Sequence, residues 1–349
     1  MSGYGWPGRL LLLLSVLLSM SGCRREEPVY NERFLAFNTL VDLSIVGVHR
    51  EAAQSAARAI EQDLGRLQAD LHAWNPGALG RVNQLLPSGD WISVSPSILP
   101  ALKLGRTFAE QSDQLLNPTI GKLVALWGFH TDTPKCQPPP DPAQIQTLLK
   151  ANPRMQDLEM DGIRLRGHNP KVQLDFDGYA VGYGLDLAIT HLREMGVQNA
   201  VINAGGNLRA IGDRDGQPWR FTIKRPSGTG VYAIVEVSGD ESLFTVSDYD
   251  QNYTFEGKTY HNVIDPRTGA PATGSHAVTV LHQEAVVAHA AASALFVAGP
   301  ERWVEIAKRM GVRYVILMDS QGTTHMTPAM AKRLELMKKD PTIKLSAPL

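Results

Sequence analysis

The chain is 349 residues long, 43% of them hydrophobic, and its 34 basic and 35 acidic residues leave a formal net charge of −1. This hydrophobic content is enough for the core of one large domain or of two intertwined lobes. A protein that binds nucleic acid needs a basic stripe to neutralise phosphates, and the near-neutral charge excludes that class of partner.

The N-terminus has the pattern of a signal peptide. Arg9 precedes an apolar run over residues 10–18, and Met20-Ser21-Gly22-Cys23 follows as a lipobox-like ending. We therefore expect residues 1–22 to be removed and Cys23 to carry a lipid that anchors the protein in the cell envelope, facing the periplasm. A short uncleaved anchor helix is the alternative, although the run is well below the roughly 20 residues that span a bilayer. The choice between inner and outer membrane stays open.

Three regions follow this segment. Residues 23–33 are charged and polar and are expected to form a tether, residues 34–335 the folded domain, and residues 336–349 a C-terminal tail. Cys136 is the one cysteine besides Cys23. No internal disulfide is therefore expected once Cys23 carries the lipid.

Apolar spacing predicts the secondary structure of the N-terminal half. Alternation indicates a strand over residues 40–48. Apolar residues at helical spacing predict a helix from Ala56 to Trp74, where Asn75-Pro76-Gly77 breaks it. Ser95-Pro96 suits the N-cap and first turn of a second helix that continues toward Leu116. The Pro-rich stretch 131–170 predicts a surface connection with a short helix near residues 143–150.

The C-terminal half predicts a unit like βαβ, made of a strand ending at Leu174, a loop over 175–178, a helix closing at Gly196 and a strand over 200–202. Further strands are expected at 219–223, 231–237, 277–281 and 314–319, and further helices at 285–298 and 303–310. Because helices and strands do not alternate regularly, the fold class is expected to be α+β, with mixed sheets and packed helices.

Three segments have patterns that suit chemistry. Two adjacent glycines in Asn203-Ala204-Gly205-Gly206-Asn207 would let backbone N–H groups approach a phosphate, although an ordinary turn also explains them. The turn Asp265-Pro266-Arg267-Thr268-Gly269 holds a carboxylate, a guanidinium and a hydroxyl, or is a simple Asp-Pro turn with Arg267 solvated. His289 and Ser293 share one face of an alanine-rich helix, where a buried histidine with its hydrogen bonds satisfied is the simpler interpretation.

Taken together, the motifs resemble those of the ApbE-type FAD:protein FMN transferases over nearly the whole mature chain. The matching segments are 37–39, 74–76, Asn117-Pro118-Thr119-Ile120-Gly121, 126–129, 174–183, 203–206, 247–249, 264–269 and 294–297. The resemblance implies a two-lobed domain that transfers the FMN part of FAD onto a Thr or Ser hydroxyl of a partner protein, with the help of a metal ion and with release of AMP. That partner would be the acceptor subunit of a membrane redox complex.

The resemblance also implies roles for particular residues. Asp265, Arg267 and Thr268 would form the catalytic loop beside the flavin phosphates, and Trp74 would stack on the isoalloxazine ring. The residues expected to bind FAD are Thr39, Trp74, Asn117, Thr119, Asp175, Gly178, Asn203, Gly205, Gly206, Asp248 and Arg267. The backbone carbonyl of Ala180, with His289, Ser293 and Asp177, would hold Mg²⁺ or another divalent ion.

Several positions depart from the family pattern. His289 stands in place of a metal-binding Asp, Val181 in place of Lys, His261-Asn262 in place of Ser-His, and Asp177 in place of Gly. An enzyme with altered metal ligation would use Asp177 as a replacement carboxylate, or would use His289 with Mn²⁺ or another softer ion. The alternative is an FAD-binding lipoprotein without transferase activity, acting as a carrier or as a partner of a membrane redox complex. A solute-binding lipoprotein unrelated to flavin is a third possibility.

Overall fold

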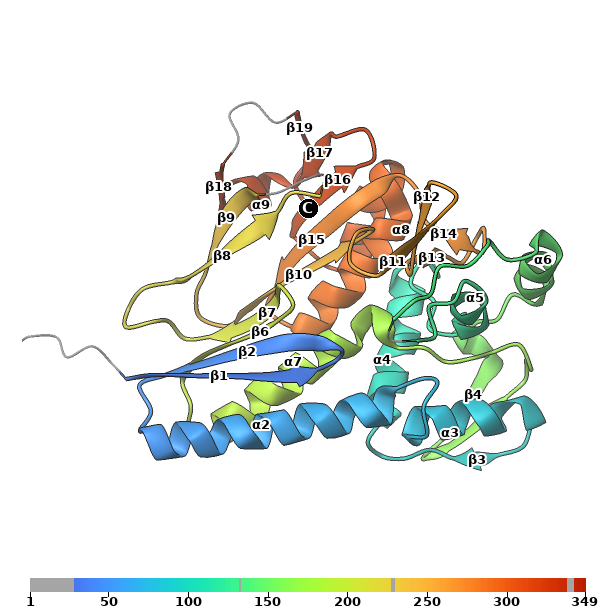
Figure 1. Ribbon diagram of the computed structural model, residues 1–349, viewed down its shortest axis with the longest axis horizontal. Helices are drawn as coiled ribbons and strands as arrows, with labels where there is room; N and C mark the ends of the chain where they lie inside the picture. Colours follow the sequence, from blue (N-terminus) through green and yellow to red (C-terminus); the bar gives the residue numbers. More distant parts are fainter. Residues whose placement is uncertain (1–27, 132, 227–229, 338–341) are drawn as a thin grey trace, which may run out of the picture.

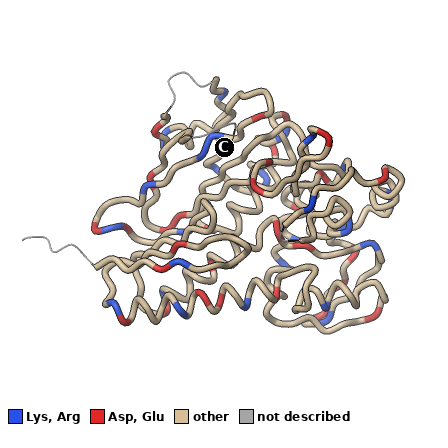
Figure 2. Tube along the Cα trace, viewed as in Figure 1, with Lys and Arg blue, Asp and Glu red and all other residues tan. Residues whose placement is uncertain are grey.

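The computed structural model describes residues 28–131, 133–226, 230–337 and 342–349, so the predicted signal peptide and lipidation at Cys23 lie outside the described residues. Its helices are α2 (Arg50–Leu71), α3 (Ala78–Leu85), α4 (Leu99–Gln111), α5 (Gly121–Leu126), α6 (Pro142–Ala151), α7 (Asp177–Glu194), α8 (Ala285–Arg309) and α9 (Pro328–Ala331). None of the helices in these ranges is long and apolar enough to cross a membrane. Acidic and basic residues are interspersed along the described chain (Figure 2).

A nine-stranded sheet forms the centre of the molecule (Figure 1). In spatial order it contains β1 (Val29–Ala36), β2 (Thr39–Val46), β6 (Asn199–Ala204), β7 (Asn207–Ile211), β10 (Glu241–Ser247), β15 (Ser275–His282), β16 (Tyr314–Asp319), β17 (Thr324–Met326) and β19 (Ile343–Leu345). Neighbouring strands are antiparallel except β17 and β19. The expected α+β class is confirmed.

The two faces of this sheet bury different partners because successive side chains of a strand point to opposite sides. On one face, Ile202, Phe244 and Val280 join the main core with residues of α2, α7 and α8. On the other, Leu243 and Ile316 pack against a three-stranded sheet. That sheet contains β8 (Trp219–Lys224), β9 (Val231–Val237) and β18 (Leu334–Leu336).

Smaller elements surround one end of the central sheet. One small sheet contains β3 (Ile92–Ser93), β4 (Leu158–Asp161) and β5 (Arg164–Gly167). Two hairpins pair β11 (Asn252–Phe255) with β12 (Lys258–His261) and β13 (Ile264–Asp265) with β14 (Ala270–Pro271). The two hairpins and α5 share a cluster that includes Trp127, Tyr253 and Tyr260.

The second predicted helix differs from α4 at both ends. The helix begins at Leu99, not after Ser95, because residues 96–98 form a turn and the Ser95 hydroxyl accepts the backbone N–H of Ser97. It ends at Gln111 rather than near Leu116, because Asp113 and Gln114 have left-handed φ angles of 57° and 63°. The predicted cap at Ser95 was therefore wrong.

The expected unit like βαβ is also wrong. Gln173 makes only an isolated bridge to Ile120, and the side chain of Asn83 accepts the backbone N–H of Leu174, so no strand ends there. The strand after α7 is β6, which pairs with β7 as an antiparallel hairpin. The glycine pair therefore connects two sheet strands and does not lead into a helix.

The expected break between the helices at 285–298 and 303–310 is confirmed, because α8 consists of two helical segments separated by a kink at Gly299, which has a φ of 66° and precedes Pro300. Two boundaries differ from the sequence expectations. Residues 29–33 of the expected tether belong to β1, whose eight residues all pair with β2. Residues 343–345 of the expected tail form β19, which adds to the edge of the central sheet beside β17.

Candidate functional site

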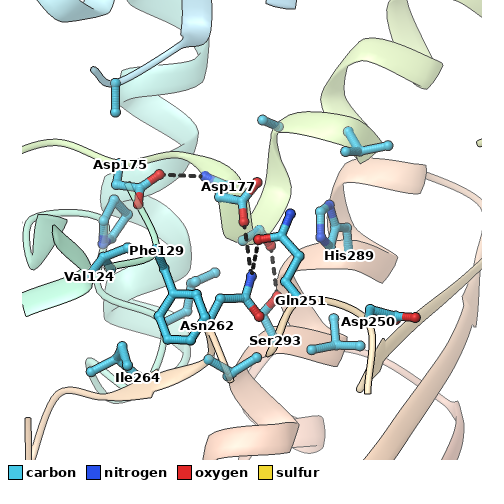
Figure 3. A pocket seen from close by; sticks show the side chains of 18 of the residues that line it. Val124, Phe129, Asp175, Asp177, Asp250, Gln251, Asn262, Ile264, His289 and Ser293 are labelled. Atoms are coloured by element: carbon cyan, nitrogen blue, oxygen red, sulfur yellow. Dashed lines mark hydrogen bonds between the residues drawn. The ribbon is translucent and has the colours of Figure 1, made fainter. Parts of the chain in front are cut away.

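A cavity of about 310 Å³ lies where the start of α7, the first half of α8 and several loops meet. Figure 3 shows the labelled side chains of Asp177, Asn262, Ser293 and His289 converging there. The cavity is at the lower end of the range for small-molecule sites, about 300–1,000 Å³. Of the residues expected to bind FAD or metal, eight line it: Trp74, Asn117, Asp175, Asp177, Gly178, Ala180, His289 and Ser293.

Trp74 reaches the cavity because the chain turns directly after α2 ends at Leu71. The Nδ1 atom of His72 accepts the backbone N–H groups of Trp74 at 3.2 Å and Asn75 at 3.1 Å, which fixes this turn. The indole also makes an edge contact with the ring of His130, with centroids 5.8 Å apart. An aromatic face at a cavity wall is suited to stacking on a flat ring such as isoalloxazine.

Asn117 and Thr119 have different positions although they belong to one motif. Asn117 lines the cavity, and its Oδ1 accepts both the backbone N–H of Thr119 at 3.1 Å and the Thr119 hydroxyl at 2.6 Å. Thr119 is completely buried. Its hydroxyl therefore holds the turn together and does not line the cavity.

Two carboxylates lie at the start of α7. Asp175 accepts the backbone N–H of Asp177 at 3.1 Å. Burial, together with the nearby charge of Asp177, raises the pKa of Asp175 to about 7. Burial within the surrounding protein likewise raises the pKa of Asp177, although its carboxylate faces the cavity, while the hydrogen bond from Asn262 lowers it. The cavity thus has an acidic wall.

His289 is a neutral, hydrogen-bonded side chain. Its Nδ1 faces the backbone N–H of Gly182 at 3.4 Å, and its ring stacks on Phe244 with centroids 5.0 Å apart. Burial lowers the pKa of His289 to about 3, against the effect of a hydrogen bond to the backbone of Tyr179. A ring held this way agrees with the simpler interpretation of a buried histidine, although its edge does line the cavity.

The donors around His289 suit a hard divalent ion better than His289 does. The Ser293 hydroxyl donates to the carbonyl of Gly178 at 2.9 Å, which places it beside the first turn of α7. Asp177 and Ala180 line the same cavity. Magnesium prefers carboxylate, hydroxyl and carbonyl oxygens, and a neutral imidazole supplies no charge. Among the described residues, no group of three or more His, Cys, Asp or Glu side chains is placed to hold a metal ion.

The three predicted catalytic residues do not line the cavity. Arg267 pairs bidentately with Asp265, with Nε to Oδ1 at 2.9 Å and Nη2 to Oδ2 at 2.7 Å, and donates to the carbonyl of Val297 at 3.1 Å. The Thr268 hydroxyl accepts the backbone N–H of Ala270 at 3.3 Å. Their loop adjoins the cavity through Ile264. A phosphate bound by Arg267 would have to compete with Asp265.

The glycine turn has a structural role in this conformation. Gly205 and Gly206 have φ angles of 62° and 104°, and Asn203 accepts the N–H of Gly206 at 2.8 Å. A Cβ on Gly205 would lie 2.6 Å from the hydroxyl oxygen of Thr39. These four residues lie outside the cavity wall, as does Asp248, which pairs with His276. The ordinary-turn interpretation therefore explains the glycines.

Several residues of the cavity wall belong to no motif or periodic pattern in the sequence. They are Gln68, His72, His130, Thr131, Thr245, Asp250 and Gln251. Most are single polar residues in loops or at strand ends, where neither periodicity nor a motif distinguishes them. Asn262 differs, since its departure from the family pattern pointed to it.

Comparison with known proteins defines the class. The chain is 38% identical over 311 residues to an FAD:protein FMN transferase of Rhodobacter capsulatus, covering 89% of this chain but 59% of that relative. It is 26% identical to the Haemophilus influenzae FAD:protein FMN transferase over 336 residues, covering 93% of this chain and 97% of that protein.

Solved structures agree. The ApbE protein of Thermotoga maritima superposes with a TM-score of 0.80 at 25% identity, covering 88% of this chain and 99% of that chain. The apo flavinyl transferase ApbE of Pseudomonas stutzeri gives a TM-score of 0.76 at 27% identity, with 88% and 97% covered. The fold is thus that of the flavin transferases. A sequence model of the ApbE family matches residues 37–316, and this chain belongs to that family.

Proposed function

We propose that this protein transfers the FMN part of FAD to a Thr or Ser hydroxyl of an acceptor protein. The hydroxyl oxygen forms a bond to the FMN phosphorus and loses its proton, the bond between that phosphorus and the bridging oxygen breaks, and AMP leaves with the bridging oxygen. The observation that carries the proposal is a cavity in an ApbE-family fold that Trp74, Asn117 and the first turn of α7 all line.

We further propose that oxygen donors of Asp177, Ser293 and the Ala180 carbonyl hold a divalent ion, Mg²⁺ or Mn²⁺, at this wall. Such an ion neutralises charge on the phosphate oxygens during transfer. In this arrangement Asp177 supplies the carboxylate, and His289 packs against Phe244 outside the ligand set. Trp74 stacks on the flavin ring, and the hydrogen bonds of His72 to the turn after α2 hold Trp74 in position.

The proposal includes the cell envelope as the place of action. A lipid at Cys23 would hold the domain on a membrane, facing the periplasm, and the acceptor would be a subunit of a redox complex in that compartment. Globomycin, which blocks lipoprotein signal cleavage, would then cause a larger, lipidated precursor to accumulate. Normal processing of wild type in its presence, and unchanged membrane association of Cys23→Ser, would contradict the anchor.

The transfer is tested by mixing purified protein, FAD, Mg²⁺ or Mn²⁺ and a candidate acceptor domain, and viewing flavin fluorescence on the acceptor in a denaturing gel. We expect a fluorescent acceptor and stoichiometric AMP. An acceptor variant with Ala in place of the Thr or Ser is the matched control and should stay unlabelled.

A second candidate function is FAD binding without transfer. It is favoured by the neutral, hydrogen-bonded state of His289 and by Val181, which puts no positive charge at the cavity wall. Tight FAD binding with no labelled acceptor under either ion would select this function. Absence of any FAD-dependent rise in the unfolding temperature would reject both.

A further inference from the structure

Three polar side chains from separate segments form a connected chain at the cavity wall (Figure 3). The Nδ2 atom of Asn262 donates to Oδ2 of Asp177 at 3.3 Å and to Oε1 of Gln251 at 3.2 Å. The backbone N–H of Asn262 also donates to the carbonyl of Gln251 at 3.1 Å. We call these three residues the amide relay.

The relay has one consistent polarity. An ionised carboxylate only accepts hydrogen bonds, so Asn262 must turn its amino group toward Asp177. The same amino group faces Gln251, which must therefore present its oxygen to Asn262. An isolated amide can be rotated by 180° at little cost, whereas here the carboxylate fixes both amides.

This polarity determines which hydrogen-bonding group of the relay is available to a ligand. With Oε1 committed to Asn262, the amino group of Gln251 remains, and it has no hydrogen-bond partner among the residues that the structure describes. All three relay residues line the cavity, and Gln251 is partly exposed to it. An amino group with two N–H donors selects an acceptor oxygen.

We propose that the relay fixes Gln251 as a hydrogen-bond donor to an oxygen of the bound flavin nucleotide, with Asp177 and Asn262 as its positioning residues. The flavin as ligand rests on the proposed function. The hydrogen-bond acceptor on the flavin nucleotide would be an oxygen atom with free lone pairs. Both the ring carbonyls of isoalloxazine and the phosphates have such oxygens.

Substitutions at Gln251 test the donor. Affinities for riboflavin, FMN and FAD are measured by flavin fluorescence, with EDTA present so that loss of a divalent ion does not contribute. Gln251→Met keeps the length and removes the amide, and we expect affinity for FAD to fall about 5- to 10-fold, the usual effect of one lost hydrogen bond. Gln251→Glu puts a charge at the same place and should weaken binding further. The control, Gln144→Met on the exposed surface of α6, should bind like wild type.

The three ligands separate the two sources of the oxygen. Weaker binding of all three ligands assigns Gln251 to a ring carbonyl. Weaker binding of FMN and FAD, with riboflavin unchanged, assigns it to a phosphate. Equal affinity of Gln251→Met and wild type for every ligand overturns the proposal. A wild-type protein that binds no flavin overturns the proposed function instead, which distinguishes the two failures.

A double-mutant cycle tests the relay itself. Asp177→Asn allows Asn262 to rotate, so the orientation of Gln251 is lost, and we expect FAD affinity to fall about 3-fold or more on the same hydrogen-bond argument. Because Asp177 acts through Gln251, the double variant Asp177→Asn with Gln251→Met should bind no worse than Gln251→Met alone. Additive losses would overturn the positioning role. Equal unfolding temperatures of the variants exclude a folding defect as the cause.

Discussion

The guanidinium of Arg267 is held by the carboxylate of Asp265 two residues earlier, through Nε to Oδ1 at 2.9 Å and Nη2 to Oδ2 at 2.7 Å. Asp265 is buried whereas Arg267 is about half exposed. The hydrogen bonds that Arg267 donates to Asp265 raise the pKa of Arg267 further above its usual value. Arg267 therefore keeps its positive charge at neutral pH, and it is the more accessible member of the pair.

Removal of the positive member should destabilise the fold. Arg267→Ala leaves the buried carboxylate of Asp265 without its main partner, and we expect the free energy of unfolding to fall by about 1–2 kcal/mol, less than for a fully buried pair because Arg267 is half exposed. Urea denaturation measures this. The double variant Arg267→Ala with Asp265→Asn should recover part of the loss, and a double variant as unstable as the sum of both changes would contradict the pairing argument.

A carboxylate at position 289 should improve metal binding. His289→Asp adds a charged oxygen ligand beside Ser293, and we expect Mg²⁺ affinity to rise about 10-fold, the scale of one added charge interaction of about 1.4 kcal/mol. Mn²⁺ binding followed by electron paramagnetic resonance, with Mg²⁺ as competitor, is a direct measurement. An affinity equal to that of wild type would mean that residue 289 does not reach the ion.

The same experiment distinguishes the role of Asp177. If its carboxylate is the ligand in wild type, Asp177→Gly should lose the ion, and Asp177→Gly combined with His289→Asp should regain it. Loss without recovery would place the carboxylate requirement at Asp177 alone. Unchanged Mn²⁺ binding by Asp177→Gly would contradict the proposed ligand set.

Buried His289 should make the protein sensitive to acid. Its folded pKa is about 3 and its ordinary value is 6.5, so between these values the unfolded chain binds the extra proton. Stability from this group is therefore complete above pH 6.5 and is lost as the pH falls toward 3. His289→Gln should show a weaker decline in unfolding free energy between pH 6.5 and 4.5 than wild type. Parallel declines in the two proteins would show that His289 is not the responsible group.

Asp175 should change the pH dependence of stability in the opposite direction from His289. Its folded pKa is raised from 3.8 to about 7, so the folded protein binds the extra proton between these values. Stability from this group is present below pH 3.8 and declines as the pH rises to 7. Without divalent ions, Asp175→Asn should gain stability relative to wild type as the pH rises from 4 to 7. A constant difference between the two proteins would contradict the pKa shift of Asp175.

The glycine turn offers a test of its structural role. Gly205→Ala combines a φ of 62° with a contact of 2.6 Å to the Thr39 hydroxyl oxygen, and should cost about 1–3 kcal/mol of unfolding free energy. Gly162→Ala, at a φ of 59° with open space around it, is the matched control for backbone strain alone. Flavin affinity should be unchanged in both folded variants. A selective loss of FAD affinity in Gly205→Ala would restore the predicted phosphate role of this turn.

Sequence patterns predicted best where one element buries one continuous face. The apolar spacing of α2 and the alternation in β2 each correspond to one buried face, and the alanine-rich first half of α8 is buried almost all round, so these three elements lie close to their predicted positions. The α4 cap was wrong because a local turn over residues 96–98 precedes the helix, and the strand at Leu174 was wrong because its backbone N–H makes a tertiary hydrogen bond to the side chain of Asn83. Asn83 lies 91 residues from Leu174, and no local pattern contains that contact.

The candidate site was predictable only in part, for a related reason. Motif residues such as Trp74 and Asp175 line the cavity, whereas Arg267 and Thr268 belong to a neighbouring turn whose polar atoms bind one another. Sequence order gives the chemistry of a side chain but not its partner. Gln251 is the opposite case. No motif contains it, and its proposed role rests on its hydrogen bond with Asn262.

If Cys23 carries a lipid, the early start of β1 would limit where the protein can work. With β1 starting at Val29, a lipid on Cys23 would be separated from the sheet by residues 24–28 alone, which span about 20 Å at full extension. A domain connected to its lipid by so short a linker could not reach across the periplasm. It would meet only hydroxyl groups presented close to its own bilayer surface, so membrane sorting of the two proteins would decide which acceptors are modified.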